Sequence, residues 1–202
     1  MTSDQLSGAL RDLEECWASA GSTTPESLAP GLTVTDAQQL AATVGLTLPD
    51  EALTWFGWHN GYNTNSTHAP RDIGCGWWLY SLEETVAWYS RTWQPTKPAP
   101  DVADLEEYWS RSYLPFISSD IGEEFLIDLA ADEDGRCVVY SANILWNEPN
   151  PPAAPSLAAF VTGLVDAIQA GAYVWHRTDN EWQSVEGHPI FDDPFRLRFL
   201  HL

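Results

Sequence analysis

Basic residues, cysteines and long apolar segments are all scarce in this sequence, and each shortage excludes a class of protein. Lysine and arginine together number 9 against 29 aspartates and glutamates, which gives a formal net charge of −20. Phosphate backbones and anionic membrane surfaces repel such a chain, so we expect neither direct nucleic-acid binding nor membrane attachment. No apolar run approaches the roughly 18 residues that a membrane-spanning helix needs. The charge therefore favours a basic protein as the partner.

The three cysteines, Cys16, Cys75 and Cys137, are odd in number and lie far apart, which indicates neither a disulfide framework nor a zinc site. Thiols that stay reduced are typical of a cytoplasmic protein. The first residues carry neither the basic nor the apolar region of a secretory signal, which agrees with a cytoplasmic location. The five histidines have no metal-ligand spacing, and the sequence predicts no metal and no cofactor.

Apolar periodicity predicts a first half made mostly of helices and a second half rich in antiparallel strands. The helices are expected over residues 3–20, 36–44, 50–57, 82–92, 101–110 and 157–170. The strands are expected over residues 77–80, 113–117, 125–129, 137–140, 144–146 and 195–199, and as a hairpin of 173–177 with 181–185. This order is typical of an α+β fold rather than of an alternating βαβ fold. With 202 residues, the chain suits one domain with a mostly antiparallel sheet packed beside helices.

Side chains that can cap a helix mark several of the expected helix starts. Ser81 and Glu84 have the spacing of a capping box. Glycine, proline and asparagine predict a loop over residues 21–31 and a tight turn over residues 58–61. The other expected N-caps are Ser3, Thr35 and Ser156.

Tryptophan is the most unusual count, with 11 residues, several of them in pairs. Tryptophan is large enough to dominate a small apolar core, and it also forms stacking platforms for sugars or bases. Both interpretations stay open for the whole set, and we favour the core. The pairs are Trp55 with Trp58, Trp77 with Trp78, and Trp88 with Trp93.

Three short motifs follow one another along the chain. The first is Leu48-Pro49-Asp50-Glu51, followed seven residues later by Trp58-His59-Asn60-Gly61. The second is the segment 114–122, with its apolar-Pro-apolar strand and Asp-Ile-Gly turn, followed by an Ile-Asp-Leu strand that ends at residue 129. The third is the Ser-Leu-x-x-Phe entry of the helix that starts after Ser156. Together they resemble the SUKH superfamily, which includes the yeast cell-wall-synthesis regulators of the Smi/Knr type and many bacterial immunity proteins.

The residues that carry this resemblance have structural explanations. Pro49 fixes a helix start, and Gly61 permits a positive φ at the helix exit. Asn60 is interpreted as a cap or turn residue rather than a catalytic one. Asp128 either faces outward or binds a loop backbone. The full set of motif residues is Leu48, Pro49, Trp55, Trp58, Asn60, Gly61, Pro115, Gly122 and Asp128.

We expect residues 1–202 to form a single SUKH-like domain with additions at both ends. The resemblance covers residues 35–171, so the helix 3–20 precedes it. The C-terminal extension 173–202 has no counterpart in the family; with about 30 residues it is too short for a core of its own, so we expect an edge hairpin or a cover. The chain also has Gly122-Glu123-Glu124 where the family usually has a Gly-Gly-Asp turn, which adds acid.

No motif of a common enzyme class is present. The sequence has no GxGxxG, P-loop, GxSxG or HExxH, and we expect no catalytic residue and no enzyme activity. One alternative of another class remains, a carbohydrate-active enzyme or a glycan-binding protein, because such proteins combine tryptophan with paired carboxylates. The pairs available are Glu83-Glu84, Glu106-Glu107 and Glu123-Glu124.

The charge is concentrated in residues 101–134, which hold eleven acids against one base, Arg111. The turns 118–124 and 130–136 lie at opposite ends of the expected strand 125–129, which spans only about 17 Å, so one interface can cover both. We therefore expect an acidic binding module, an immunity protein that neutralises a basic toxin domain such as a nuclease. The alternative within the family is a regulatory scaffold. The expected partner-binding residues are Asp101, Asp104, Glu106, Glu107, Asp120, Glu123, Glu124, Asp132, Glu133 and Asp134.

Overall fold

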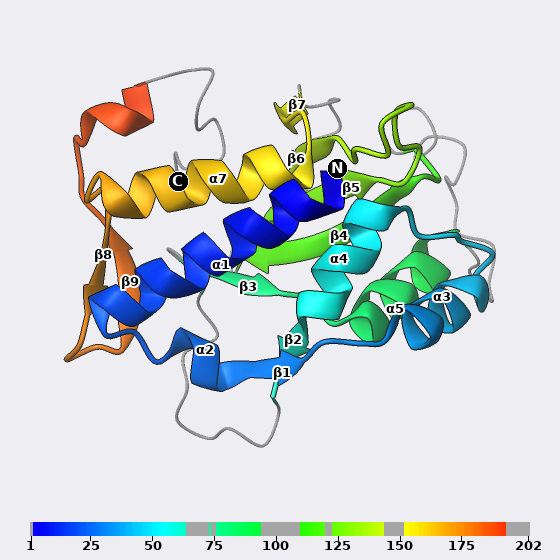
Figure 1. Ribbon diagram of the computed structural model, residues 1–202, viewed down its shortest axis with the longest axis horizontal. Helices are drawn as coiled ribbons and strands as arrows, with labels where there is room; N and C mark the ends of the chain where they lie inside the picture. The colour runs from blue at the N-terminus through cyan, green and yellow to red at the C-terminus, as the bar shows by residue number, and fades with distance from the viewer. Residues whose placement is uncertain are drawn as a thin grey trace.

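The computed structural model describes residues 2–63, 73, 76–93, 110–119, 123–143 and 152–192 (Figure 1). Its helices are α1 (Thr2–Ala20), α2 (Thr24–Ser27), α3 (Val34–Ala42), α4 (Asp50–Trp58), α5 (Leu82–Trp93) and α7 (Leu157–Gln169), with a short 3-10 helix, η1, at Pro189–Asp192. Its strands are β1 (Leu28–Pro30), β2 (His59–Tyr62), β3 (Trp77–Leu79), β4 (Tyr113–Ser119), β5 (Glu123–Asp128), β6 (Val139–Asn143), β7 (Pro152–Ala154), β8 (Tyr173–His176) and β9 (Glu181–Ser184).

The central element is a five-stranded sheet in the order β3-β4-β5-β6-β7, in which every neighbouring pair is antiparallel. Two smaller antiparallel sheets, β1-β2 and β8-β9, stand apart from it. Helices α1 and α7 lie side by side across the sheet (Figure 1). This arrangement confirms the predicted α+β fold with a mostly antiparallel sheet beside helices.

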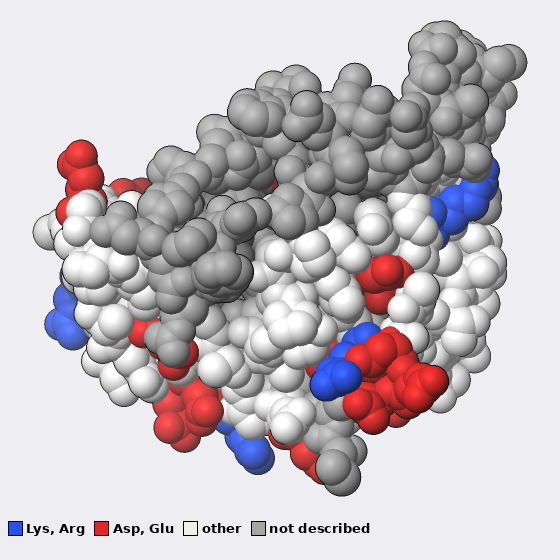
Figure 2. Space-filling model, turned by 90° about the horizontal axis from the view of Figure 1, so that it is seen from above, with Lys and Arg blue, Asp and Glu red and all other residues white. Residues whose placement is uncertain are grey.

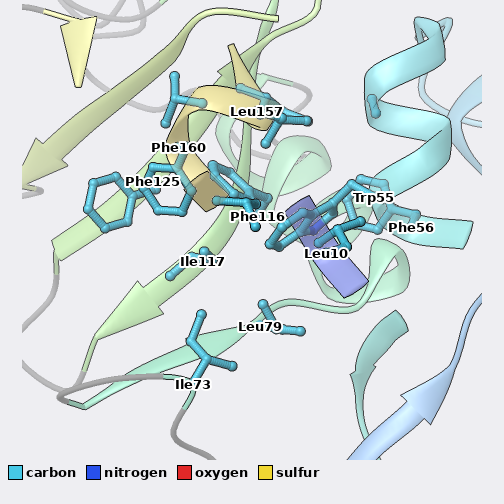
Figure 3. Close-up of a cluster of buried hydrophobic side chains, with 14 of the residues drawn as sticks. Leu10, Trp55, Phe56, Ile73, Leu79, Phe116, Ile117, Phe125, Leu157 and Phe160 are labelled. Atoms are coloured by element: carbon cyan, nitrogen blue, oxygen red, sulfur yellow. The ribbon is translucent and has the colours of Figure 1, made fainter. Parts of the chain in front are cut away.

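The core lies between the sheet and these helices (Figure 3). Phe116 of β4 meets Trp55 of α4 edge to face at 5.0 Å, and Phe125 of β5 meets Phe160 of α7 at 4.9 Å. Leu10 brings α1 into the same cluster. Aromatic rings in tilted contact at this spacing give a densely packed, directional core.

Most of the described tryptophans belong to this core, as predicted. The indole N–H groups of Trp17, Trp55 and Trp93 are buried without a hydrogen-bond partner in the described structure, so ring contacts rather than hydrogen bonds hold these side chains. A stacking platform for sugars needs exposed faces, which these side chains do not have. The buried tryptophans are Trp17, Trp55, Trp77, Trp93, Trp175 and Trp182.

Two of the predicted helix starts are confirmed atom by atom. The Ser81 hydroxyl accepts from the Glu84 N–H at 3.2 Å while the Glu84 carboxylate accepts from the Ser81 N–H at 2.8 Å, which completes the capping box. The Ser156 hydroxyl accepts from the Ala159 N–H at 3.0 Å and caps α7.

Two other predicted caps were wrong. The N-cap of α3 is Thr33, whose hydroxyl accepts from the Asp36 N–H at 3.1 Å, so the helix begins two residues earlier than Thr35 would place it. Ser3 lies inside α1, and its hydroxyl pairs with Thr54 of α4 at 2.8 Å. Each of these segments offers more than one hydroxyl residue. Thr33 also donates to the Asp36 carboxylate at 2.7 Å, whereas the Ser3 hydroxyl is taken by Thr54.

Several boundaries also differ from the prediction. The expected loop 21–31 contains α2 and β1, and the expected turn 58–61 continues α4 directly into β2, which pairs with β1. Strand β6 begins at Val139 rather than at Cys137, whose N–H donates to Glu51. The predicted helix 101–110 (apart from residue 110) and the strands 144–146 and 195–199 lie outside the described residues.

The predicted C-terminal hairpin is confirmed as β8-β9. Asn180 in its turn has a φ of 57°, a left-handed conformation that asparagine tolerates. Trp175 and Trp182 lie 5.6 Å apart on its buried side, and the Trp182 indole N–H donates to the Thr24 hydroxyl at 3.3 Å. The hairpin therefore packs on the segment that follows α1.

Candidate partner-binding surface

The acidic turn between β5 and β6 is the part of the predicted interface that the structure describes most fully. Asp132, Glu133 and Asp134 are all exposed there. Asp132 Oδ1 accepts from the backbone N–H groups of Asp134 at 3.0 Å and Arg136 at 2.9 Å, so its carboxylate holds the turn in shape. One of the three acids is thus a structural residue as well as a surface charge.

Arg136 offsets part of the charge of this turn. Its Nε lies 2.7 Å from Asp132 Oδ2 and its Nη2 lies 3.2 Å from Asp134 Oδ2. Hydrogen bonds from the Arg136 backbone and side chain lower the pKa of Asp132. Exposed pairs of this kind contribute little to stability, but they reduce the field that a partner meets. On the face shown in Figure 2, the coloured acidic side chains form separate groups, and basic side chains lie beside some of them.

Glu124 was wrongly predicted to be on the partner-binding surface. The strand β5 starts at Glu123, two residues earlier than expected, and Glu124 is an inner member of the sheet, paired with Ser118 and Ala142. Its side chain is only 2% exposed. The strand continues through the residues that the sequence assigned to the turn, which removes Glu124 from the surface.

Most of the other acids predicted for the interface lie outside the described residues. Glu123 lies in β5, where its backbone alone is described. Asp101, Asp104, Glu106, Glu107 and Asp120 lie outside the described residues, as does Gly122 of the motif set.

Asn60 acts as a helix cap, as predicted. Its Oδ1 accepts from the Leu82 N–H at 2.7 Å, and its Nδ2 donates to Glu83 at 2.8 Å, so it caps α5 from β2. The next residue, Gly61, has a φ of 72°, and a Cβ there would lie 2.7 Å from the Ser81 backbone nitrogen. The Asn-Gly motif therefore brings β2 close against the start of α5.

The remaining described motif residues also have structural roles. Pro49 is the N-cap residue of α4, and Leu48 and Trp55 are buried beside it. The Asp128 carboxylate accepts from the Ala130 N–H at 2.9 Å, so it binds a loop backbone, which is one of the two interpretations. Pro115 lies in β4, and its carbonyl accepts from the Thr85 hydroxyl at 2.9 Å.

The sequence analysis missed the role of Glu51. It is fully buried and accepts from the N–H groups of Cys137 at 2.6 Å, Leu157 at 3.3 Å and Ala158 at 3.4 Å. Burial raises the pKa of Glu51, and the three backbone donors oppose that rise. The nearest of these partners is 86 residues away in the chain, so no local signal could reveal them.

One carboxylate–histidine pair has the composition of a catalytic dyad. Glu14 Oε1 lies 2.7 Å from the Trp58 indole nitrogen and 3.3 Å from His59 Nε2. His59 Nδ1 lies 2.8 Å from the Ala29 carbonyl oxygen. Both ring nitrogens are therefore engaged inside the protein, whereas a general base needs one that faces a substrate. The pair ties α1 to the β1-β2 sheet.

The described part of the chain holds neither a cluster of metal-ligand side chains nor a membrane-spanning helix. In those ranges, no three histidine, cysteine, aspartate or glutamate side chains converge as metal ligands would. No helix that the structure describes is both long and apolar enough to cross a membrane.

The fold and these contacts define a class of protein: an acidic α+β domain whose motif residues cap helices and shape turns. The chain belongs to the SMI1 / KNR4 family (SUKH-1), whose model matches residues 31–163. Proteins of this family are generally binding modules rather than enzymes. A comparison with curated protein sequences gave no match. The family match begins after β1 and ends inside α7, so α1 and the hairpin β8-β9 lie outside it.

Proposed function

We propose that this chain is an immunity protein, a binding module that neutralises a basic toxin domain by forming a stoichiometric complex in the cytoplasm. Family membership supports a protein-binding role. The net charge of −20 supports a basic partner, and a nuclease is the clearest example, because it must be basic to hold phosphates. An acidic inhibitor is attracted to such a surface over a distance and covers it.

A part of the acidic charge has a structural use and supports no partner. Acids lie in the first turn of five described helices, where they stabilise the positive end of the helix dipole. They are Asp4, Glu26, Asp36, Asp50 with Glu51, and Glu83 with Glu84. The charge at these positions is accounted for by helix stabilisation and is therefore no evidence for a binding partner.

One observation favours the β5–β6 turn as part of the interface. Glu133 is exposed, lies at no helix start and makes no hydrogen bond or ion pair in the described structure. It stands between Asp132 and Asp134 in a turn that those two acids and Arg136 hold in shape. The Glu133 carboxylate has no structural contact and lies on an ordered turn, so it is suited to attracting a basic partner.

The interface that we propose extends from this turn to the other end of β5. That strand has six residues and spans about 20 Å, so a standard interface covers both ends. The proposed acids are Asp101, Asp104, Glu106, Glu107, Asp120, Glu123, Asp132, Glu133 and Asp134.

The proposal is tested by co-expression with the toxin domain encoded beside the chain's own gene. We expect the chain to restore growth of cells that express the toxin domain, and we expect the two purified proteins to elute as a one-to-one complex. Growth without complex formation, or a neighbouring gene whose product is not toxic, contradicts the immunity function. A stable complex with a non-toxic protein supports the alternative, a regulatory scaffold of the same family.

The location of the interface has its own kinetic test. Replacing Glu133 and Asp134 with serine is expected to lower the association rate constant by a few-fold and to flatten its salt dependence, with little change in dissociation. The control replaces Asp179 and Glu186, exposed acids of the C-terminal region, with serine and removes the same charge. An equal loss of rate in both variants would mean that only net charge matters, and the β5–β6 turn would have no special part.

Burial of most described tryptophans weighs against the alternative of a carbohydrate-active enzyme or glycan-binding protein. That alternative depends on tryptophan faces and carboxylates that meet at a surface. Six described tryptophans are buried, and Glu124 of the pair Glu123-Glu124 is buried with them.

A further inference from the structure

The outer face of the five-stranded sheet, opposite the helices, carries a buried acid that neither the core nor the proposed interface explains. Across this face, register places Trp78, Ser118, Glu124 and Ala142 in one row through β3, β4, β5 and β6. The next residue, Phe125, points to the other side, into the core. Glu124 is 2% exposed, so its carboxyl group has lost nearly all its contact with water.

The described surroundings of this carboxyl group provide few hydrogen-bond donors. The Tyr80 hydroxyl donates to Glu124 Oε1 at 3.1 Å. Glu124 Oε2 is buried and has no hydrogen-bond partner among the residues that the structure describes. An ionised carboxylate normally accepts several hydrogen bonds or pairs with a cation when it is buried. Within the described ranges, Glu124 in its ionised form would have a single donor, Tyr80.

Among the described residues, no charge of opposite sign compensates for this shortage. Tyr80, at the end of β3, is the titratable group in contact, and it also has a side-chain hydrogen bond with Ser118 of β4. Glu84 of α5, also an acid, acts on Tyr80 as a further negative charge. The neighbour from β6 in the same row is Ala142. In the described structure, every group that faces Glu124 from these elements is neutral or acidic.

We propose that Glu124 is a proton-binding site of the folded protein, and that the proton it holds secures the contact between β5 and the junction of β3 with α5. The proton enters from solvent and resides on the carboxyl group, which then forms a neutral pair with Tyr80. Loss of the proton to solvent leaves a buried negative charge beside one hydroxyl donor.

The junction on the other side of the pair is a short, highly connected segment. The Tyr80 N–H donates to the Phe116 carbonyl at 3.0 Å and extends the β3-β4 ladder by one residue. The next residue, Ser81, forms the capping box of α5 with Glu84. The residue after it, Leu82, donates its N–H to Asn60. A change at Glu124 therefore acts on the edge strand of the sheet and on the start of α5 together.

Burial raises the pKa of Glu124 to about 7, and the hydrogen bond from Tyr80 opposes part of that rise. The unfolded chain has the ordinary value of 4.5. Because the folded value is the higher one, this group's contribution to stability is complete below 4.5 and is lost as the pH rises to about 7. Above about pH 7, Glu124 is ionised in both states, and its effect on stability no longer changes with pH.

The direct test is a titration of the glutamate side-chain carboxyl carbons by NMR on the full chain. We expect one resonance, assigned to Glu124 by its absence from Glu124→Gln, to titrate between pH 6 and 8. In Tyr80→Phe the same resonance is expected to titrate at still higher pH, because the described donor to the ionised form is gone. A wild-type midpoint near 4.5 would overturn the proposal.

The linked test measures unfolding by urea from pH 5 to pH 8. Relative to Glu124→Gln, the unfolding equilibrium constant of the wild type is expected to rise roughly 70-fold over this range. The matched control is Glu133→Gln, an exposed acid, which should keep the wild-type dependence. A Glu124→Gln profile parallel to that of the wild type would refute the proposal. If that variant does not fold, the Glu124 resonance is assigned by backbone correlation in the wild type, and its titration alone decides.

Discussion

At the scale of single residues, this protein uses polar side chains to satisfy backbone groups that belong to distant elements. Glu51 accepts from the Cys137 N–H before β6 and from two N–H groups in the first turn of α7. Asn60 does the same for the first N–H of α5. The first N–H groups of a helix have no partner inside the helix, so a buried helix start needs such an acceptor from elsewhere.

Replacing Glu51 with alanine is expected to destabilise the fold by about 3 kcal/mol, because it leaves three backbone N–H groups buried without an acceptor. Equilibrium unfolding in urea measures this change. Asp50→Ala is the matched control, since Asp50 is the exposed neighbour in the same helical turn, and it should cost no more than about 1 kcal/mol through the helix dipole. Similar losses in the two variants would mean that Glu51 acts only on its own helix.

At the scale of elements, the parts outside the family match are integrated into the core. Helix α1 buries Leu6, Leu10, Leu13 and Trp17, and the Trp17 ring stacks on Trp58 of α4 with centroids 5.9 Å apart. The hairpin β8-β9 is anchored by its buried tryptophans. Both additions bury apolar area, so we expect each to be needed for full stability.

Trp182→Ala tests this expectation for the hairpin. Trp182 is 3% exposed, and truncating a buried tryptophan costs about 3–5 kcal/mol. Gln183→Ala, the next residue along β9, points to the other side of the hairpin and should change stability by less than about 1 kcal/mol. Thermal unfolding followed by circular dichroism distinguishes the two. An unchanged melting temperature for Trp182→Ala would show that the hairpin is a loose appendage.

At the scale of the whole molecule, the dominant feature is an excess of negative charge that the fold must accommodate. Acids at helix starts are partly compensated by helix dipoles, and Arg136 compensates the β5–β6 turn. The remaining carboxylates repel one another across the surface. A net charge so far from zero keeps a protein from associating with itself but opposes the compact state.

Added salt is therefore expected to stabilise this protein. Raising NaCl from 20 to 500 mM shortens the screening length to a few ångströms and should raise the melting temperature by roughly 5 °C. KCl at the same ionic strength should have the same effect, which separates screening from specific ion binding. A melting temperature that falls or stays constant would show that self-repulsion does not limit stability.

The elements predicted correctly from the sequence are those whose deciding contacts are local. The capping box Ser81–Glu84, the Ser156 cap and the turn at Asn180 each involve groups within four residues of one another. Sequence spacing determines whether such groups can meet, so the pattern alone is enough. The placing of tryptophan in the core was also correct, because apolar area drives burial wherever it lies in the chain.

Only the tertiary structure decided which acids are buried. Side chains alternate along a strand, so the environment of Glu124 depends on where β5 begins and on what packs against each face of the sheet. The acceptors of Glu51 come from segments that fold against α4 from far along the chain. The sequence by itself determined an acidic α+β domain of this family. Which carboxylates hold the fold together and which face a partner depends on long-range packing, because burial and hydrogen bonding arise between elements that sequence spacing does not relate.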